Sequence, residues 1–182
     1  MTRLYLVRHG RASAGFGEAL DPGLDEVGLS QAREAAQKLA ELDLMPIISS
    51  PMKRCQETAA PLAAQWNQTP IINEGVSEIP SPSQDMDERS AWLRNFLPGT
   101  WSEGEDWVHE WKARVVETLM SIDQDSVIFS HFIAINAVVG HALNDDRVVC
   151  FRPDNASVTV LEIDGGNFHV LSLGSEANTD VG

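Results

Sequence analysis

The most constraining feature of this sequence is a short apolar run that ends in a histidine flanked by an arginine and a glycine. The run is Leu4–Val7, and the tripeptide after it is Arg8-His9-Gly10. Residues 47–54 and 127–131 have the same layout, because each segment begins with an apolar run and ends in polar side chains. Short apolar runs are typical of buried β-strands. Each predicted strand therefore carries its chemically capable residues at its carboxyl end.

Ligands of an open α/β sheet bind beyond the carboxyl ends of its strands. If the three runs are neighbouring parallel strands, four side chains converge on one pocket: Arg8, His9, Arg54 and His131. Arg54 also falls near the start of a predicted helix, whose positive dipole end favours anions. Two imidazoles and two guanidiniums suit an anion with several oxygens, which indicates phosphate.

Composition limits the partners of such a pocket. The chain has 182 residues, 43% of them hydrophobic, and a net charge of −14, which indicates one acidic globular domain. An acidic surface repels nucleic acid and anionic membranes, so neither is expected as a partner. No apolar stretch is long enough to span a membrane, and the first run is too short for a signal peptide. Cys55 and Cys150 lack metal-type spacing, and we expect a cytoplasmic protein.

Turn residues and hydrophobic periods divide the chain into alternating strands and helices. Strands are predicted at residues 3–8, 46–49, 70–73, 126–130, 148–152, 156–163 and 167–173. Helices are predicted at residues 30–42, from 50 with a kink or break at 61, and at 85–97, 105–122 and 131–143. Ser30 and Ser50 are the predicted N-caps of the first two helices. This alternation predicts an α/β fold, a three-layer α/β/α sandwich with a mostly parallel sheet and an antiparallel edge formed by the last hairpin.

Several segments resemble one family. Leu6-Val7-Arg8-His9-Gly10 resembles the signature of the histidine phosphatase superfamily, which includes the phosphoglycerate mutases. Residues 25–32 resemble that family's entry into its first helix, and residues 49–59 resemble the segment with its second phosphate-binding arginine. Ser130-His131 matches its second histidine, and residues 155–158 resemble the start of its late strands. The resemblance implies a compact, phosphatase-type member.

The resemblance also implies roles for these residues. His9 would attack phosphorus and form a phosphohistidine. Its other ring nitrogen needs an acceptor, expected to be a backbone carbonyl, to fix the tautomer. Arg8, Arg54 and His131 would hold the phosphate oxygens, over which charge spreads in the transition state. These cations and imidazoles take the place of a metal, so no metal or other cofactor is expected.

Three further positions relate to the family pattern. The family's proton donor is a glutamate after the third strand, for which the candidates are Glu74 and Glu78, and the pattern Val76-Ser77-Glu78-Ile79 favours Glu78. Ser13 is the candidate for a small polar phosphate ligand, with a plain loop hydroxyl as the alternative. Phe132 stands where the family usually has glycine, so its ring either narrows the pocket or turns into the core.

The chain reads as a single domain, residues 1–182, with a small lid or insertion at about 79–125 and a disordered polar tail at 176–182. Four tryptophans lie in the lid segment. Trp92 and Trp111 follow apolar helix faces and are predicted to belong to the core. Trp101 and Trp107 are better candidates for the rim of the pocket.

The leading functional prediction is a metal-independent phosphomonoesterase that acts through phosphohistidine on a phosphorylated small molecule. A phosphoglycerate-type mutase ranks lower, because the chain is compact and lacks the long basic-rich insertion with which such mutases hold a second acidic group. A phosphatase of phosphohistidine proteins stays open as a variant of the leading prediction. A non-catalytic phosphate-binding protein of the same fold is disfavoured by the intact set of Arg8, His9, Arg54 and His131.

Overall fold

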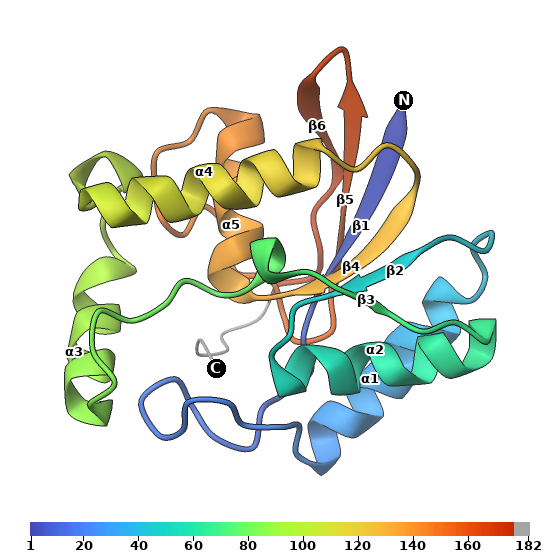
Figure 1. The fold of residues 1–182 in the computed structure, drawn as a ribbon, viewed down its shortest axis with the longest axis horizontal. Coiled ribbons are helices and arrows are strands. Elements are labelled where there is room, and N and C mark those ends of the chain that lie inside the picture. The colour runs from blue at the N-terminus through green and yellow to red at the C-terminus, as the bar shows by residue number, and fades with distance from the viewer. Residues whose placement is uncertain (177–182) are drawn as a thin grey trace.

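The computed structural model describes residues 1–176, which fold around one six-stranded sheet (Figure 1). Its strands are β1 (Thr2–Arg8), β2 (Ile47–Ser49), β3 (Ile71–Ile72), β4 (Ser126–Ser130), β5 (Val158–Asp164) and β6 (Asn167–Ser172). Its helices are α1 (Glu26–Leu39), α2 (Lys53–Trp66), α3 (Met86–Phe96), α4 (Asp106–Met120) and α5 (Phe132–Leu143), with short 3-10 turns η1 (Glu74–Val76) and η2 (Trp101–Glu103). None of these helices is long and apolar enough to cross a membrane.

The order of strands across the sheet is β3-β2-β4-β1-β5-β6. β4 lies between β1 and β2 and runs parallel to both, and Arg8 at the end of β1 pairs with Ser130 at the end of β4. β5 and β6 are antiparallel and form the predicted edge. The mixed α/β class and the neighbouring parallel strands are therefore confirmed, and the three apolar runs end at the same edge of the sheet.

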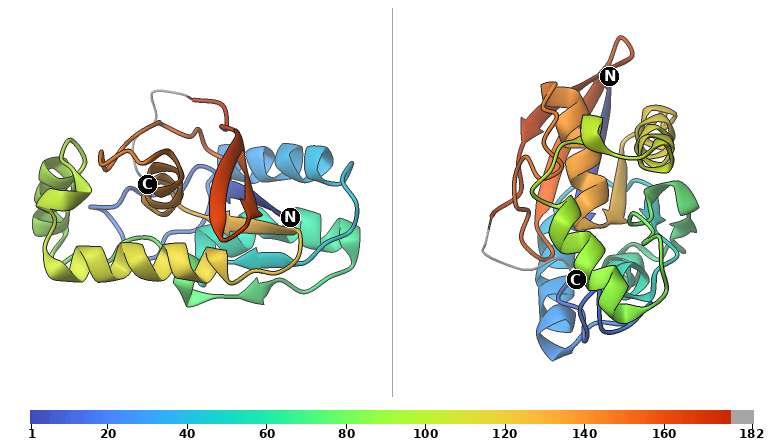
Figure 2. Two further views of the ribbon diagram at one scale, coloured as in Figure 1. Left: turned by 90° about the horizontal axis from the view of Figure 1, so that it is seen from above. Right: turned by 90° about the vertical axis from the view of Figure 1, so that its left-hand side faces the viewer.

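Helices cover both faces of the sheet. In the view from above, α1 and α2 lie on one side and α4 and α5 on the other (Figure 2). Each face of the sheet has its own hydrophobic core, and alternate residues of β1 belong to different cores. Leu6 packs in the core with α4 and α5, and Val7 packs in the core with α1 and α2. This alternation is the two-residue period of a strand that is buried on both faces.

The first helix begins earlier than the sequence suggested. Asp25, not Ser30, is its N-cap, because the Asp25 carboxylate accepts the Gly28 N–H at 2.8 Å. Ser30 lies inside the helix, which ends at Leu39 with Ala40 as its C-cap. Both Asp25 and Ser30 have good capping chemistry, and the earlier one caps the helix.

The second helix also differs from the prediction at its ends. It begins at Lys53 with Met52 as the N-cap residue, and the Ser50 hydroxyl accepts the Met52 N–H at 3.2 Å in the turn before it. Pro61 does not end the helix, which continues to Trp66. The residues around Pro61 are buried in the core on this side of the sheet, and that packing offsets the missing backbone hydrogen bond.

The predicted strand at residues 148–152 is wrong. The Asn136 side chain of α5 accepts the backbone N–H groups of Cys150 and Phe151, at 2.9 and 3.2 Å. In a strand these two N–H groups would donate to a neighbouring strand. Here the buried Asn136 side chain accepts them, so the segment forms a loop that packs on α5.

The segment between residues 79 and 125 contains α3 and α4, whose aromatic rings contact each other. Trp92 of α3 lies with its ring centroid 5.7 Å from that of Trp107 of α4, and Trp101 stacks on Trp111 at 6.2 Å. Trp101 is only 2% exposed, so it belongs to the core, whereas the sequence makes it a candidate for the rim of the pocket. At the other end of the chain, Glu176 forms a β-bridge with Pro153, and the rest of the expected disordered tail, 177–182, lies outside the described residues.

Candidate active site

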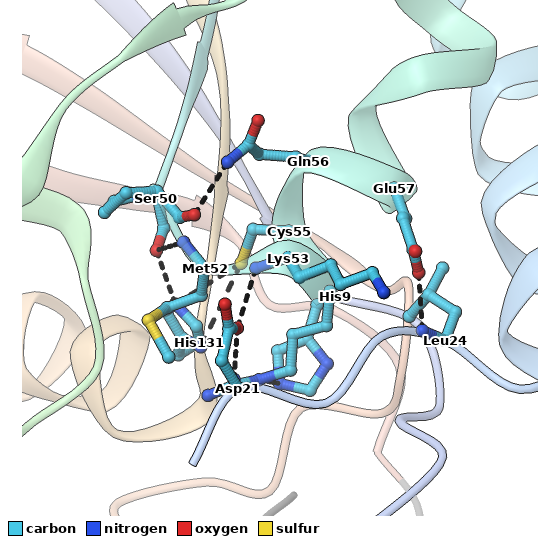
Figure 3. A network of polar contacts seen from close by, with 12 residues as sticks. His9, Asp21, Leu24, Ser50, Met52, Lys53, Cys55, Gln56, Glu57 and His131 are labelled. Atoms are coloured by element: carbon cyan, nitrogen blue, oxygen red, sulfur yellow. Dashed lines mark hydrogen bonds and ion pairs between the residues drawn. The ribbon is translucent and has the colours of Figure 1, made fainter.

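Four side chains gather at the carboxyl ends of the central strands: Arg8, His9, Arg54 and His131. We call them the strand-end cluster. The His9 backbone N–H donates to the Ser130 carbonyl oxygen at 3.0 Å, which extends the pairing of β1 and β4 by one residue. This places the His9 and His131 rings edge to face, with centroids 5.3 Å apart (Figure 3).

The His9 ring has a defined tautomer. Its Nδ1 lies 2.7 Å from the Gly10 carbonyl oxygen, which only accepts hydrogen bonds, so Nδ1 carries the proton. Its Nε2 then carries the lone pair and accepts from Arg54 Nε at 3.2 Å. The backbone carbonyl expected to orient this ring is therefore that of Gly10, which leaves the lone pair on Nε2.

Gly10 allows the loop after β1 to pack tightly against α1. A Cβ at Gly10 would lie 2.6 Å from the Gly28 carbonyl oxygen, closer than real side chains approach a backbone. The Gly10 N–H also donates to Thr58 Oγ1 on α2, at 2.9 Å. The loop that orients His9 is thus held between α1 and α2.

Arg54 is the second residue of α2 and is nearly buried. Asp21 holds this end of the helix, because one of its carboxylate oxygens accepts the Lys53 N–H at 2.9 Å. The same oxygen lies 4.0 Å from Arg54 Nη1. The guanidinium is therefore fixed between Asp21 on one side and His9 on the other.

Arg8 is the most deeply buried of the charged groups. Its Nη1 donates to the Pro153 carbonyl oxygen at 2.9 Å, and its Cζ lies 5.1 Å from the centre of the Phe132 ring. Burial lowers the pKa of Arg8 to about 10, and the nearby Glu78 charge opposes this shift. The group therefore stays charged at neutral pH. Phe132 is fully buried, so its ring turns into the core and supports Arg8.

His131 has two neighbours that the sequence argument did not single out. Its Nε2 lies 2.8 Å from Ser50 Oγ and 3.3 Å from Cys55 Sγ, and all three residues lie near the start of α2 (Figure 3). Burial, followed by the charge of Arg54, lowers the pKa of His131 well below its ordinary value, so the ring is neutral. Burial also raises the pKa of the Cys55 thiol to about 12, and the thiol stays protonated. Both neighbours lie in the segment whose resemblance drew attention only to Arg54.

Glu78 lies beside the start of α5. Its Oε2 accepts the Ile133 N–H at 3.0 Å, and its Oε1 accepts the N–H groups of Ala134 at 3.0 Å and Ile79 at 3.1 Å. Burial raises the pKa of Glu78, whereas these N–H groups and Arg54 oppose the rise. Glu74, the alternative candidate, is exposed at the start of η1.

Ser13 lies in the loop after β1. It is exposed, and its backbone N–H donates to the Gly23 carbonyl oxygen at 2.8 Å. Among the described residues its hydroxyl makes no hydrogen bond to the cluster, so its role as a phosphate ligand stays a prediction. The neighbouring Arg11 pairs with Asp25 through Nε at 2.5 Å, which is a surface ion pair.

Two further arginines add positive charge near the cluster. Arg152 places its Cζ 5.6 Å from the centre of the Phe132 ring, and its charge helps to lower the pKa of Arg8. Arg89, on α3, has its pKa lowered by burial and by Arg54. Nothing in the local sequence around either residue indicates this position. Within residues 1–176 no group of three or more His, Cys, Asp or Glu side chains is arranged to hold a metal ion.

Comparison with known proteins finds one family. The family model described as the histidine phosphatase superfamily (branch 1) matches residues 4–176 of this chain. A 2,3-bisphosphoglycerate-dependent phosphoglycerate mutase of Thermoplasma acidophilum is 28% identical, over 96% of this chain and 93% of the mutase. Phosphoserine phosphatase 1 of Hydrogenobacter thermophilus is also 28% identical, over 95% of this chain and 92% of that protein.

Solved structures share the fold. A mutant phosphoserine phosphatase from Entamoeba histolytica, in complex with phosphoserine, has a TM-score of 0.76 at 24% identity and covers 96% of this chain and 98% of its own. A mycobacterial glucosyl-3-phosphoglycerate phosphatase has a TM-score of 0.74 at 22% identity, over 97% of this chain and all of that chain.

Proposed function

This chain belongs to the histidine phosphatase superfamily, branch 1, and from that premise we propose that it is a metal-independent phosphomonoesterase. The proposed reaction transfers phosphate from an ester to His9 and then from His9 to water. The observation that carries the proposal is the His9 ring, whose Nδ1 donates to the Gly10 carbonyl oxygen while Nε2 keeps its lone pair. A neutral, oriented imidazole is what attack on phosphorus requires.

In the first step, His9 Nε2 forms a bond to phosphorus while the bond from phosphorus to the ester oxygen breaks. Arg54 Nε lies 3.2 Å from the nucleophile, so a phosphoryl group on His9 is in reach of this guanidinium. Arg8 adds a second positive charge, and His131 adds a neutral imidazole. Positioned donors and cations stabilise the charge that spreads over the phosphoryl oxygens.

The departing alkoxide needs a proton, which we assign to Glu78. Oε1 of this carboxyl accepts two backbone N–H groups and Oε2 accepts one, so Oε2 has more room for a proton. Burial raises the pKa of Glu78, a shift toward the protonated form that a proton donor needs. In the second step, water attacks the phosphohistidine, the bond from phosphorus to nitrogen breaks, and the proton from water returns to Glu78.

A phosphoglycerate-type mutase is the second candidate, because the Thermoplasma relative is one. Both reactions pass through phosphohistidine and differ in the group that receives the phosphoryl. In a mutase a second hydroxyl receives it, and in a phosphatase water does. Release of inorganic phosphate that outpaces interconversion of 2- and 3-phosphoglycerate supports the phosphatase, and the reverse supports the mutase.

The proposed substrate is a phosphorylated small molecule, with a phosphohistidine protein as the alternative. A cytoplasmic location is part of the same proposal. Its support is that both cysteines are free thiols, which suits a reducing compartment.

The decisive experiment traps the intermediate. Brief mixing with labelled phosphomonoester in the presence of EDTA should leave an acid-labile phosphoryl group on His9. His9→Ala should abolish both the label and turnover, because no other imidazole takes its place. His169→Ala, at an exposed position of β6, is the matched control and should behave as the unmodified protein. Normal turnover of His9→Ala, or an EDTA-dependent loss that a divalent metal restores, would contradict the proposal.

A further inference from the structure

A groove between α4 and α5 has no part in the catalytic proposal. The two helices lie on the same face of the sheet (Figure 1), and the groove lies beside the last turn of α5. Its volume is about 490 Å³, which is within the range of small-molecule sites. We call this space, lined in part by Trp101, Lys112, Ala113, Val116 and His141, the α4–α5 groove.

The α4–α5 groove is remote from the strand-end cluster. Helix α5 begins directly after His131 and reaches the groove at His141. At the rise of an α-helix this separation corresponds to roughly 15 Å. A small ligand in the groove would therefore lie outside the phosphate site.

Hydrogen bonds hold the segments around the groove in fixed positions. Nε2 of His109 on α4 lies 2.7 Å from the Trp101 carbonyl oxygen and donates to it, because a carbonyl only accepts. The Trp101 N–H donates to the Asp146 carbonyl oxygen, also at 2.7 Å. The groove is thus formed before a ligand arrives, which lowers the conformational cost of binding.

Lys112 gives the groove its positive charge. The residue is half-buried, and its Nζ lies 4.9 Å from the centre of the Trp101 ring. Within residues 1–176 its ammonium makes no hydrogen bond and no ion pair with a carboxylate. Burial lowers the pKa of Lys112, because the charge is partly removed from water. A partly desolvated ammonium without a paired carboxylate favours an anion beside it.

Two carboxylates that line the groove limit the charge of that anion. Asp146 opposes the pKa shift of Lys112, but both of its carboxylate oxygens already accept hydrogen bonds from Ser102. Glu117 adds a second negative charge to the lining. These charges repel a dianion such as phosphate more strongly than they repel a single carboxylate.

We propose that the α4–α5 groove is a second ligand site, which binds a small monocarboxylate with an apolar body. The carboxylate pairs with the Lys112 ammonium, and the apolar body covers Ala113 and Val116. The site is independent of the proposed function, because it shares no residue with the strand-end cluster.

The test compares three ligands of similar shape and different charge: 2-naphthoate, 2-naphthamide and 2-naphthylmethylamine. Calorimetric titration is carried out in excess inorganic phosphate, which competes for the strand-end cluster. 2-Naphthoate should bind one to one and at least about 10-fold more tightly than either analogue, the effect of one charged hydrogen bond. Equal binding of the three compounds, or no binding of 2-naphthoate, would overturn the inference.

Lys112→Met removes the charge and keeps an unbranched side chain. It should weaken the binding of 2-naphthoate about 10-fold and leave that of 2-naphthamide unchanged. Lys112→Arg should retain most of the affinity, because the charge remains. The matched control is Arg114→Gln, at an exposed position of α4 outside the groove, which should bind as the unmodified protein does. Unchanged affinity in Lys112→Met would contradict the proposal.

A second variant tests the position of the ligand without removing a charge. Ala113 is exposed on α4, so the fold can accommodate Ala113→Trp, whose ring would fill the groove. This variant should keep its melting temperature close to that of the unmodified protein and lose the binding of both 2-naphthoate and 2-naphthamide. Retained binding would place the ligand elsewhere on the protein and would also overturn the inference.

Discussion

The strand-end cluster lies next to a second group of residues, Phe16, Arg89 and Trp92, which we call the substrate wall, and the two are held in place by different means. Backbone groups orient the cluster, as in the hydrogen bond from His9 Nδ1 to the Gly10 carbonyl oxygen. In the wall, residues far apart in the chain hold one another: the Arg89 side chain contacts the Phe16 ring and carbonyl oxygen, and the Phe16 ring stacks near Trp92. The cluster is therefore set by local strand geometry, whereas the wall is set by contacts between segments far apart in the chain.

This difference suggests that the two groups of residues control different properties, the rate of the reaction and the preference among substrates. Changes in the strand-end cluster should slow the reaction of every substrate, because they affect the phosphoryl group that all substrates share. Changes in the substrate wall should alter the preference among substrates and leave the common chemistry intact. The following variants test that division, beginning with the largest expected effect.

Arg54→Gln should lower kcat/KM about 10²- to 10³-fold, because it removes a buried cation from the phosphoryl oxygens. The loss should be similar for 3-phosphoglycerate, glycerol 3-phosphate and p-nitrophenyl phosphate. Steady-state phosphate release from the three compounds measures it, with Lys53→Gln, the exposed neighbour, as the control. A loss confined to 3-phosphoglycerate would place Arg54 in the substrate wall and break the comparison.

Glu78→Gln should lower the rate for alkyl phosphates about 10²-fold, because their leaving group needs a proton. The first-turnover release of p-nitrophenol should change far less, because that leaving group departs without help. Burial raises the pKa of Glu78, so the protonated fraction, and with it the alkyl rate, should fall as pH rises through that raised pKa. The p-nitrophenol burst should lack this decline.

Glu74→Gln is the control for this experiment, since Glu74 is exposed at the start of η1. It should leave both rates and their pH profiles unchanged. Equal losses on alkyl and aryl substrates in Glu78→Gln would mean that Glu78 only holds the start of α5. A selective loss in Glu74→Gln would move the proton donor to that residue.

Ser50→Ala should have the smallest effect, a drop in kcat of about 3- to 10-fold, the equivalent of one hydrogen bond. The Ser50 hydroxyl lies 2.8 Å from His131 Nε2, so its loss should loosen that ring. Ser49→Ala is the matched control, because Ser49 is equally buried and its hydroxyl bonds to the Ser50 carbonyl oxygen instead. Both variants should lose about 1 kcal/mol of unfolding free energy, and only Ser50→Ala should lose kcat.

The strand-end cluster could be predicted from the sequence because its position depends on which residues directly follow a strand. An apolar run of strand length, followed directly by His9 or His131, already places that residue at the edge of a parallel sheet. The same reasoning places Arg54 in the first turn of α2, although the helix begins three residues after the predicted cap.

The substrate wall could not be predicted in this way. Arg89 lies 35 residues after Arg54, and its place beside the site depends on how α3 meets the loop of Phe16. Trp101 was misjudged for the same reason, because its burial depends on stacking against Trp111 of α4. A hydrophobic period indicates which face of a helix is buried and does not indicate which distant segment covers it.

The close contact of Gly10 with Gly28 has a consequence for how such a protein can change over evolutionary time. A side chain at either position would collide with backbone atoms of the other segment, so neither glycine has an acceptable single-step replacement. The loop that orients His9 therefore cannot change one residue at a time at these two positions. Phe16 and Arg89 meet through the Arg89 side chain, which contacts the Phe16 ring and its carbonyl oxygen, so each side chain can be exchanged without a collision between two backbones. Descendants of this chain can therefore acquire new substrates through the wall while they inherit the chemistry unaltered.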